Sequence, residues 1–185
     1  MKKYAMVLGI SLALAAGAGV LSLRADDAPA TPDIKKLADQ VGKKSWDELA
    51  KEGEAVAKKY DDLQDIMHVF KPRNKEAQVS GIGIGDKPGA ILPDGIEQKL
   101  LRMAGRVGVT DADMAKAPAL KRMAEIAAAV AAATVHKPNK DAQQTKDDIK
   151  KWQELSREMH EGALELIKAL ETRNRVQAKA AAVKL

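Results

Sequence analysis

One segment of the chain, residues 45–70, carries an apolar stripe at the spacing of a packed helix. The members of the stripe follow one another at alternating steps of three and four residues: Trp46, Leu49, Gly53, Val56, Tyr60, Leu63, Met67 and Phe70. A helix places residues with this spacing on one side, where they pack against other helices along its whole length. The sequence therefore predicts a long helix over residues 45–70 and an all-α, bundle-like fold.

Start signals predict further helices around this stripe. Thr31 is expected to be the N-cap of a helix with Pro32 at its first position, and Ser45-x-x-Glu48 and Thr145-x-x-Asp148 are capping patterns. Asp94, with an acidic residue three positions later, is expected to cap a short helix in the same way. The expected helices cover residues 31–41, 45–70, 94–103, 115–135 and 145–170.

Beyond residue 170 the apolar register changes. The next apolar positions are Val176, Ala180 and Val183, and polar residues occupy the continuation of the earlier stripe. The change of register indicates that the helix breaks near Thr172 and that a new helix begins. The alternative is one continuous helix, because no glycine or proline intervenes. The last helix has no cap residue before the sequence ends, so we expect that it is truncated at Leu185.

The first 25 residues have the features of a secretory signal peptide. Two lysines precede an uncharged apolar run over residues 5–23, and cleavage is expected after Ala25. Leu23 makes the cleavage site imperfect, so an uncleaved N-terminal anchor stays an alternative and is the only membrane contact expected. Either interpretation predicts one domain, residues 26–185, in the periplasm. The chain has no cysteine, so this domain must be stabilised by packing alone.

Charge excludes some function classes. Without Lys2, Lys3 and Arg24, residues 26–185 contain 28 Lys and Arg and 26 Asp and Glu, interleaved along the sequence. This balance disfavours a nucleic-acid partner. Carboxylates stand one helical turn from lysines, as Glu54 does from Lys58, which is typical of solvated helix faces. No serine has an activating context and no cysteine is present, so we do not expect an enzyme.

Residues 71–95 form a long segment rich in glycine and proline. Its Gly81-Ile82-Gly83-Ile84-Gly85 run resembles a phosphate-binding loop but lacks the Lys-Ser/Thr pair that should follow and the strand that should precede it. A tightly turned crossover is therefore predicted, and its length makes it a candidate for a functional loop.

Two of the predicted helices carry a Met-His pair: Met67-His68 and Met159-His160. If these helices pack together, two thioethers and two imidazoles approach one another, and such donors suit haem iron or copper. A copper site would use His68 and His160. The alternative is that both methionines belong to the core, with the histidines pointing to solvent or to the flank of the bundle.

Several strings carry a resemblance to a known family. Trp152 and Met159 are spaced as Trp-x(6)-Met in a late helix, an alanine-rich stretch fills residues 177–185, and residues 67–73 read Met-His-Val-Phe-Lys-Pro-Arg before the glycine-rich loop. Together they resemble the cytochrome c′-like proteins, the class II c-type cytochromes. The resemblance implies a four-helix bundle that holds one haem and exchanges electrons with a redox partner protein. A short N-terminal helix and the long crossover loop would be additions to this bundle, and a homodimer stays open.

The same family attaches haem through Cys-x-x-Cys-His in its last helix, after a stretch like residues 177–185. This sequence ends before that place and has no cysteine, so it cannot attach haem covalently. Either the haem motif is missing from a truncated sequence, or the protein lacks haem or holds it non-covalently. The residues expected to line a cofactor pocket are Met67, His68, Phe70, Trp152 and Met159. The alternative function is a cofactor-free periplasmic bundle with a structural or interaction role.

Overall fold

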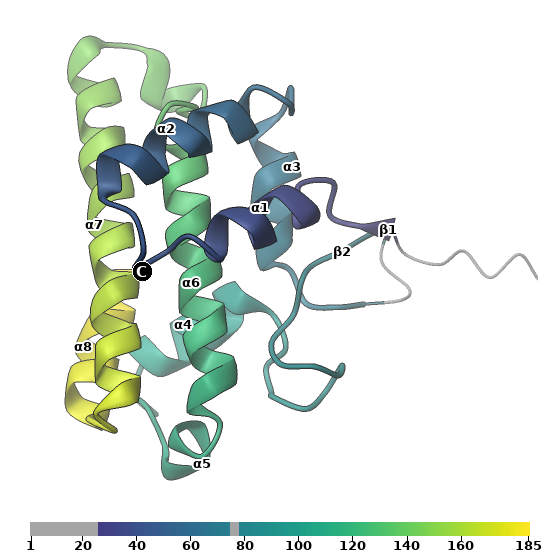
Figure 1. Ribbon diagram of the computed structural model, residues 1–185, viewed down its shortest axis with the longest axis vertical. Helices are drawn as coiled ribbons and strands as arrows, with labels where there is room; N and C mark the ends of the chain where they lie inside the picture. The colour runs from purple at the N-terminus through teal and green to yellow at the C-terminus, as the bar shows by residue number, and fades with distance from the viewer. Residues whose placement is uncertain (1–25, 75–77) are drawn as a thin grey trace, which may run out of the picture.

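The structure is a computed structural model that describes residues 26–74 and 78–185 (Figure 1). Its described part is mostly helical and contains almost no strand, so the all-α prediction is confirmed. The elements are β1 (Asp26–Asp27), α1 (Thr31–Ala38), α2 (Trp46–Ala57), α3 (Leu63–Met67), the 3-10 helix η1 (His68–Phe70), β2 (Val79–Ser80), α4 (Ile96–Ala104), α5 (Asp111–Met114), α6 (Ala117–Thr134), the 3-10 helix η2 (Asp141–Gln143), α7 (Lys146–Glu171) and α8 (Arg175–Val183). β1 and β2 form a parallel pair, and β2 directly precedes Gly81, so the expectation that no strand precedes the glycine-rich run is wrong. The predicted signal peptide lies outside the described residues, and among those described no helix has the length and apolar character needed to cross a bilayer.

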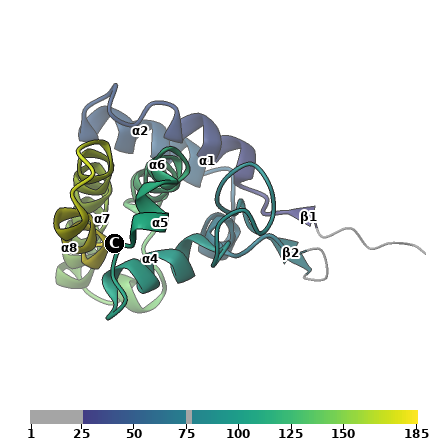
Figure 2. The same ribbon diagram turned by 90° about the horizontal axis from the view of Figure 1, so that it is seen from below.

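Helix α6 lies at the centre of the molecule. It runs antiparallel to α7, and α1 and α2 cover another of its sides (Figures 1 and 2). Alanine is its commonest residue, and twelve of its eighteen residues are buried. Small side chains let neighbouring helices come close. At Gly53 of α2, an added Cβ would lie 2.1 Å from the carbonyl oxygen of Ala132, so only glycine permits this helix contact.

The single helix predicted over residues 45–70 is wrong. Helix α2 ends at Ala57, and α3 begins at Leu63 after a turn. Asp62 accepts a hydrogen bond from the Gln64 backbone at 2.9 Å and caps α3, so its side chain favours a new helix start over continuation. The Tyr60 hydroxyl donates to the Asp33 carboxylate of α1 at 2.8 Å, which fixes the turn. The break changes the register, so Ile66 and Val69 are buried, whereas Leu63 and Met67 are half-buried.

The N-cap of α1 is Ala30, and Thr31 is the first helical residue, so the prediction that Thr31 caps this helix is wrong. The cap signals at Ser45 and Thr145 are confirmed. The Ser45 and Thr145 hydroxyls accept hydrogen bonds from the backbone three residues later and cap α2 and α7. The chain also breaks after α7: Arg173 has a φ of 53°, and Asn174 caps α8 by accepting from the Gln177 backbone at 3.0 Å. Helix α8 then buries Ala178, Ala181 and Ala182, and its valines point outward.

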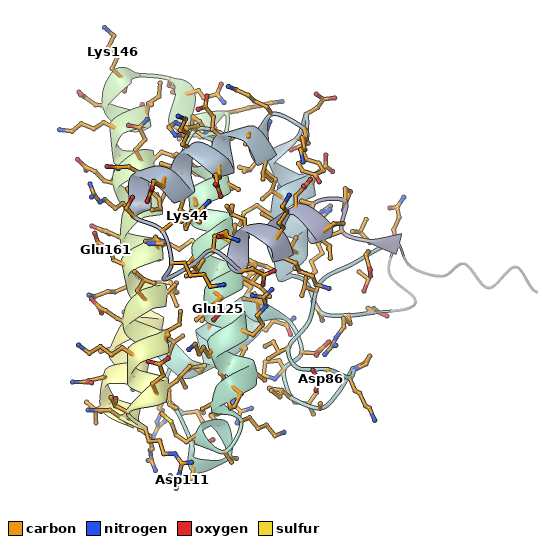
Figure 3. All side chains as sticks on the ribbon, in the orientation of Figure 1. Lys44, Asp86, Asp111, Glu125, Lys146 and Glu161 are labelled. Carbon is orange, nitrogen blue, oxygen red and sulfur yellow. The ribbon has the colours of Figure 1, made fainter. Side chains whose placement is uncertain are left out.

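Charged side chains cover the outside of the molecule. Lys146 and Glu161 of α7 and Asp111 of α5 are exposed and project into solvent (Figure 3). The predicted pair of Glu54 and Lys58 forms, with 2.8 Å between carboxylate and ammonium. Such exposed pairs each contribute little to stability. The solvated helix faces expected from the sequence are therefore present.

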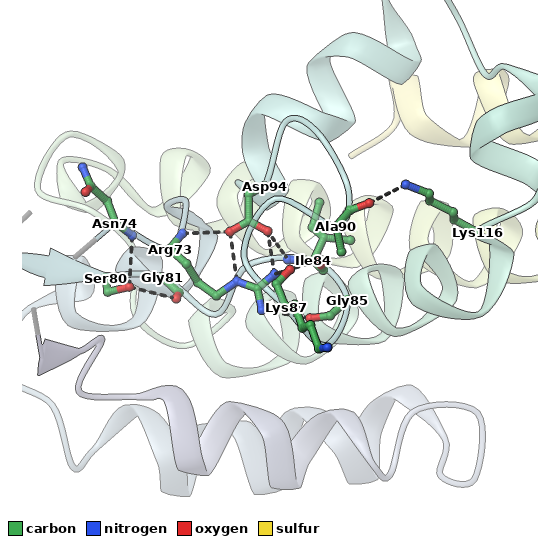
Figure 4. A network of polar contacts seen from close by, with 10 residues as sticks. All are labelled: Arg73, Asn74, Ser80, Gly81, Ile84, Gly85, Lys87, Ala90, Asp94 and Lys116. Carbon is green, nitrogen blue, oxygen red and sulfur yellow. Dashed lines mark hydrogen bonds and ion pairs between the residues drawn. The ribbon is translucent and has the colours of Figure 1, made fainter. Parts of the chain in front are cut away.

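An ion pair organises the described part of the crossover, residues 71–74 and 78–95, and the prediction that Asp94 caps α4 is wrong. Asp94 is 8% exposed and accepts from Arg73 Nη2 at 2.6 Å, from Arg73 Nε at 2.9 Å and from the Ile84 backbone at 3.2 Å (Figure 4). Arg73 also donates to the carbonyl oxygens of Ile84, Gly85 and Lys87. Burial would raise the pKa of Asp94, but the hydrogen bonds from Arg73 and Ile84 outweigh it and lower that pKa. The Arg73 guanidinium group therefore fixes the conformation of the glycine-rich loop through these hydrogen bonds.

Candidate cofactor groove

A groove of about 660 Å³ opens between α3 and η1 on one side, α7 on another, and α4 and α8. All five residues expected to line a cofactor pocket contribute to it: Met67, His68, Phe70, Trp152 and Met159. They come from two parts of the chain that are far apart in sequence. The rest of the apolar lining is Leu63, Leu100, Leu101, Ala104, Ala182, Val183 and Leu185. The groove is therefore a largely apolar recess that holds one imidazole and two thioethers.

The short helix α3 and η1 form one wall. Ile66 and Val69 anchor this segment, because both are fully buried in the core. Met67 and His68 lie between these two anchors and face the groove, where both side chains are half-buried. Phe70 closes this wall and is 8% exposed. The helix break at residue 62 is what turns Met67 out of the core.

Helix α7 supplies a second wall. Ser156 and Ala163 are buried on its inner side, and Trp152 and Met159 stand beside that side and line the groove, half-buried. The Trp152 indole donates from Nε1 to the carbonyl oxygen of Thr134 at 2.9 Å, at the end of α6. A buried indole N–H needs such a partner. This bond fixes the orientation of the ring at the groove.

His160 does not line the groove. It is 4% exposed, and its ring packs against Trp46 of α2 with centroids 4.8 Å apart and planes tilted by 50°. Burial lowers the pKa of His160, and a hydrogen bond with the Ala128 backbone only partly offsets this. Its Nδ1 is buried without a hydrogen-bond partner in the part of the chain that the structure describes.

The two histidines proposed for copper therefore have different surroundings. His68 faces the groove, whereas His160 packs between α2 and α6. Within residues 26–74 and 78–185, no cluster of three or more His, Cys, Asp or Glu could hold a metal ion. A shared copper site stays a prediction.

Two walls of the groove, formed by α4 and α8, were not predicted from the sequence. Leu100 and Leu101 enter from α4, and Val183 enters from α8. Their place depends on the packing of α4 against α8, a contact between segments distant in sequence. A signal was available in α8, since its valines lie off the alanine face that the helix buries.

Comparisons of the chain with protein-family models, with curated proteins and with solved structures found no match. Its function is therefore inferred from the groove and from the donor atoms that line it.

Proposed function

We propose that this protein is an exported, cytochrome c′-like haem-binding bundle that takes part in electron transfer and holds haem in the groove between α3, α4, α7 and α8. The observation that carries the proposal is the convergence of Met67, His68 and Met159, from two separate helical segments, on one apolar groove. Cofactor sites in helical bundles are built from inward side chains of facing helices. The antiparallel packing of α6 and α7 supports the bundle part of the proposal.

The residues of the groove fit haem in size and in chemistry. Binding sites for small molecules and cofactors commonly measure about 300–1,000 Å³ and are mostly apolar, and this groove is about 660 Å³. Imidazole nitrogen and thioether sulfur are the axial donors that haem iron takes in electron-transfer proteins. Covalent attachment is not available to this chain, which has no cysteine, so the proposal is for haem held by packing and ligation.

Each lining residue has a role in this proposal. Met67 or His68 would bind the iron from the α3–η1 wall, and Met159 would bind it from the α7 wall. Phe70, Trp152 and the leucines of α4 would pack on the ring and exclude water. When bound, haem supplies one-electron transfer, and the chain tunes it through axial ligand identity and apolar surroundings.

The test is a titration of the purified protein with ferric haem, followed by its visible spectrum. We expect one haem to bind per chain with a shifted Soret band. His68→Ala should change the band or weaken binding by about tenfold, since a lost ligand contact of roughly 1.4 kcal/mol has that effect. His136→Ala is the matched control, because His136 is exposed and lies outside the groove. No Soret shift, or equal effects of the two substitutions, would contradict the proposal.

A further inference from the structure

The exposed apolar side chains of this protein are concentrated in one region. In the described part of the chain, six large apolar side chains are more than half exposed, and five of them lie on or next to α4 and α8: Leu92, Leu101, Val107, Val176 and Val183. The sixth is Leu155 of α7. Clustered exposed apolar side chains mark interaction sites more often than isolated ones do.

Contacts between the segments unite these side chains into one surface, which we call the α4–α8 face. Helix α4 packs against α8, and Leu101 and Val183 line the same groove. The loop that follows α4 also touches α8, because a Cβ at Gly108 would lie 3.3 Å from the Lys179 side chain. Val176 is 81% exposed and stands two helical turns from Val183 on the same side of α8.

The same segments hold the positive charge of the domain. Residues 96–113 and 172–185 contain seven Lys and Arg and three Asp and Glu, whereas the rest of residues 26–185 contains 21 and 23. Three of the seven cations are paired with carboxylates. The other four have no carboxylate partner among the described residues and are exposed: Arg102, Arg106, Arg173 and Lys179. Exposed cations without a carboxylate partner therefore lie on the same segments as the exposed apolar side chains.

We infer that the α4–α8 face is a docking surface for a partner protein whose own surface has an apolar centre edged by Asp and Glu. Opposite potentials steer association and fix register, and apolar centres with polar rims are typical of protein interfaces. A second copy of this chain fits poorly, because it would set cations against cations. A membrane fits poorly too, since the patch consists of Leu and Val and lacks the aromatic residues typical of interfacial anchors.

The inference does not depend on the proposed cofactor. Its test uses the haem-free protein and a probe of the stated chemistry: an amphipathic helical peptide with leucines on one side and glutamates on the other. A peptide with lysines in place of the glutamates is the charge control. We expect the glutamate peptide to bind, more weakly as salt rises, and the lysine peptide not to bind.

Two substitutions on the face are compared with two on α7. Val176→Ser and Lys179→Glu together should weaken binding of the glutamate peptide at least about tenfold, because they remove apolar contact and reverse a charge. Leu155→Ser with Lys151→Glu, at two exposed positions of α7, should leave it unchanged. Circular dichroism checks that both variants stay folded.

Four results would overturn the inference. The first is that the glutamate and lysine peptides bind equally well. The second is that both double variants lose the same amount of affinity for the glutamate peptide. A third is sedimentation of the protein with phosphatidylserine vesicles that Val176→Ser abolishes, which would assign the face to a membrane. The fourth is a dimer in analytical ultracentrifugation that Val176→Ser dissociates, which would assign it to self-association. None of these results involves a haem spectrum, so failure here and failure of the proposed function are told apart.

Discussion

Lys99 and Asp113 form an ion pair inside the protein, with 2.5 Å between Nζ and Oδ1, and their side chains are 1% and 7% exposed. The pair joins α4 to α5 beside the groove. Lys99 also donates to the carbonyl oxygen of Leu92, and the Thr110 hydroxyl donates to the same carboxylate group at 2.8 Å. Burial would raise the pKa of Asp113, but the hydrogen bonds from Lys99 and Thr110 outweigh it and lower that pKa.

Removing one member of this pair should destabilise the protein strongly. Lys99→Met leaves a buried carboxylate without its cation, and such losses cost about 3–5 kcal/mol. Urea unfolding measures the change. The double variant Lys99→Met/Asp113→Leu should recover most of the stability, because an apolar pair needs no desolvated charge. If Lys99→Met unfolds at the same urea concentration as the parent protein, the pair does not hold α4 in place.

The Arg73–Asp94 pair should control the crossover loop locally. Arg73→Lys keeps the charge but loses the planar group that reaches Asp94 and three carbonyl oxygens, so it should not be a conservative change. We expect faster amide exchange over residues 81–94 and little change in α6 and α7. Uniform exchange changes across the protein would instead assign Arg73 to global stability.

Acid should weaken the packing of α2 on α7 through His160. The pKa of His160 is lowered in the folded state from its usual 6.5, chiefly by burial, so the unfolded chain binds its proton more readily. Stability from the neutral imidazole is therefore complete above about pH 7 and falls as the pH drops through 6.5 toward the lower folded value.

The measurement is the free energy of unfolding between about pH 7.5 and about pH 5.5, one unit on either side of the ordinary histidine pKa. His160→Phe should reduce the loss of unfolding free energy on acidification, whereas His136→Phe, at an exposed position, should not. Identical pH profiles for the parent protein and His160→Phe would exclude this role.

Gly53 should tolerate no side chain. An added Cβ would meet the Ala132 backbone at 2.1 Å, so α2 must move away from α6. Such overpacking typically costs about 1–3 kcal/mol, and Gly53→Ala should lower stability in thermal unfolding despite the better helix propensity of alanine. Ala55→Ser, on the exposed side of α2, serves as the control. A more stable Gly53→Ala variant would mean that the two helices are not in close contact.

Local signals were enough to predict most helix boundaries. Ser45 and Thr145 cap their helices through backbone groups three residues away, so the pattern and the structure depend on the same short segment. The break at Thr172 was visible because the apolar register changes there. Asp94 shows the limit, since the same cap pattern is present but Arg73, 21 residues upstream, takes the carboxylate. A tertiary partner of this kind cannot be read from spacing.

The groove was predicted only in part, again because it depends on contacts between segments that are distant in the sequence. The apolar stripe of residues 45–70 continues through the turn at residue 60 without a change of spacing, so the sequence did not indicate the break that brings Met67 to the groove. The turn depends on a hydrogen bond between Tyr60 and Asp33, which belong to different helical segments. Leu101 and Val183 were missed because α4 and α8 meet only in the folded chain.

The central claim, that haem binds between α3 and α7, is tested most directly by the methionine methyl signals of the protein in NMR. Ferric haem is paramagnetic and broadens or shifts nearby methyl resonances. One equivalent should affect Met67 and Met159, which line the groove, far more than Met114 and Met123, which are buried elsewhere. Unchanged Met67 and Met159 signals, or equal broadening of all four, would contradict haem binding in this groove.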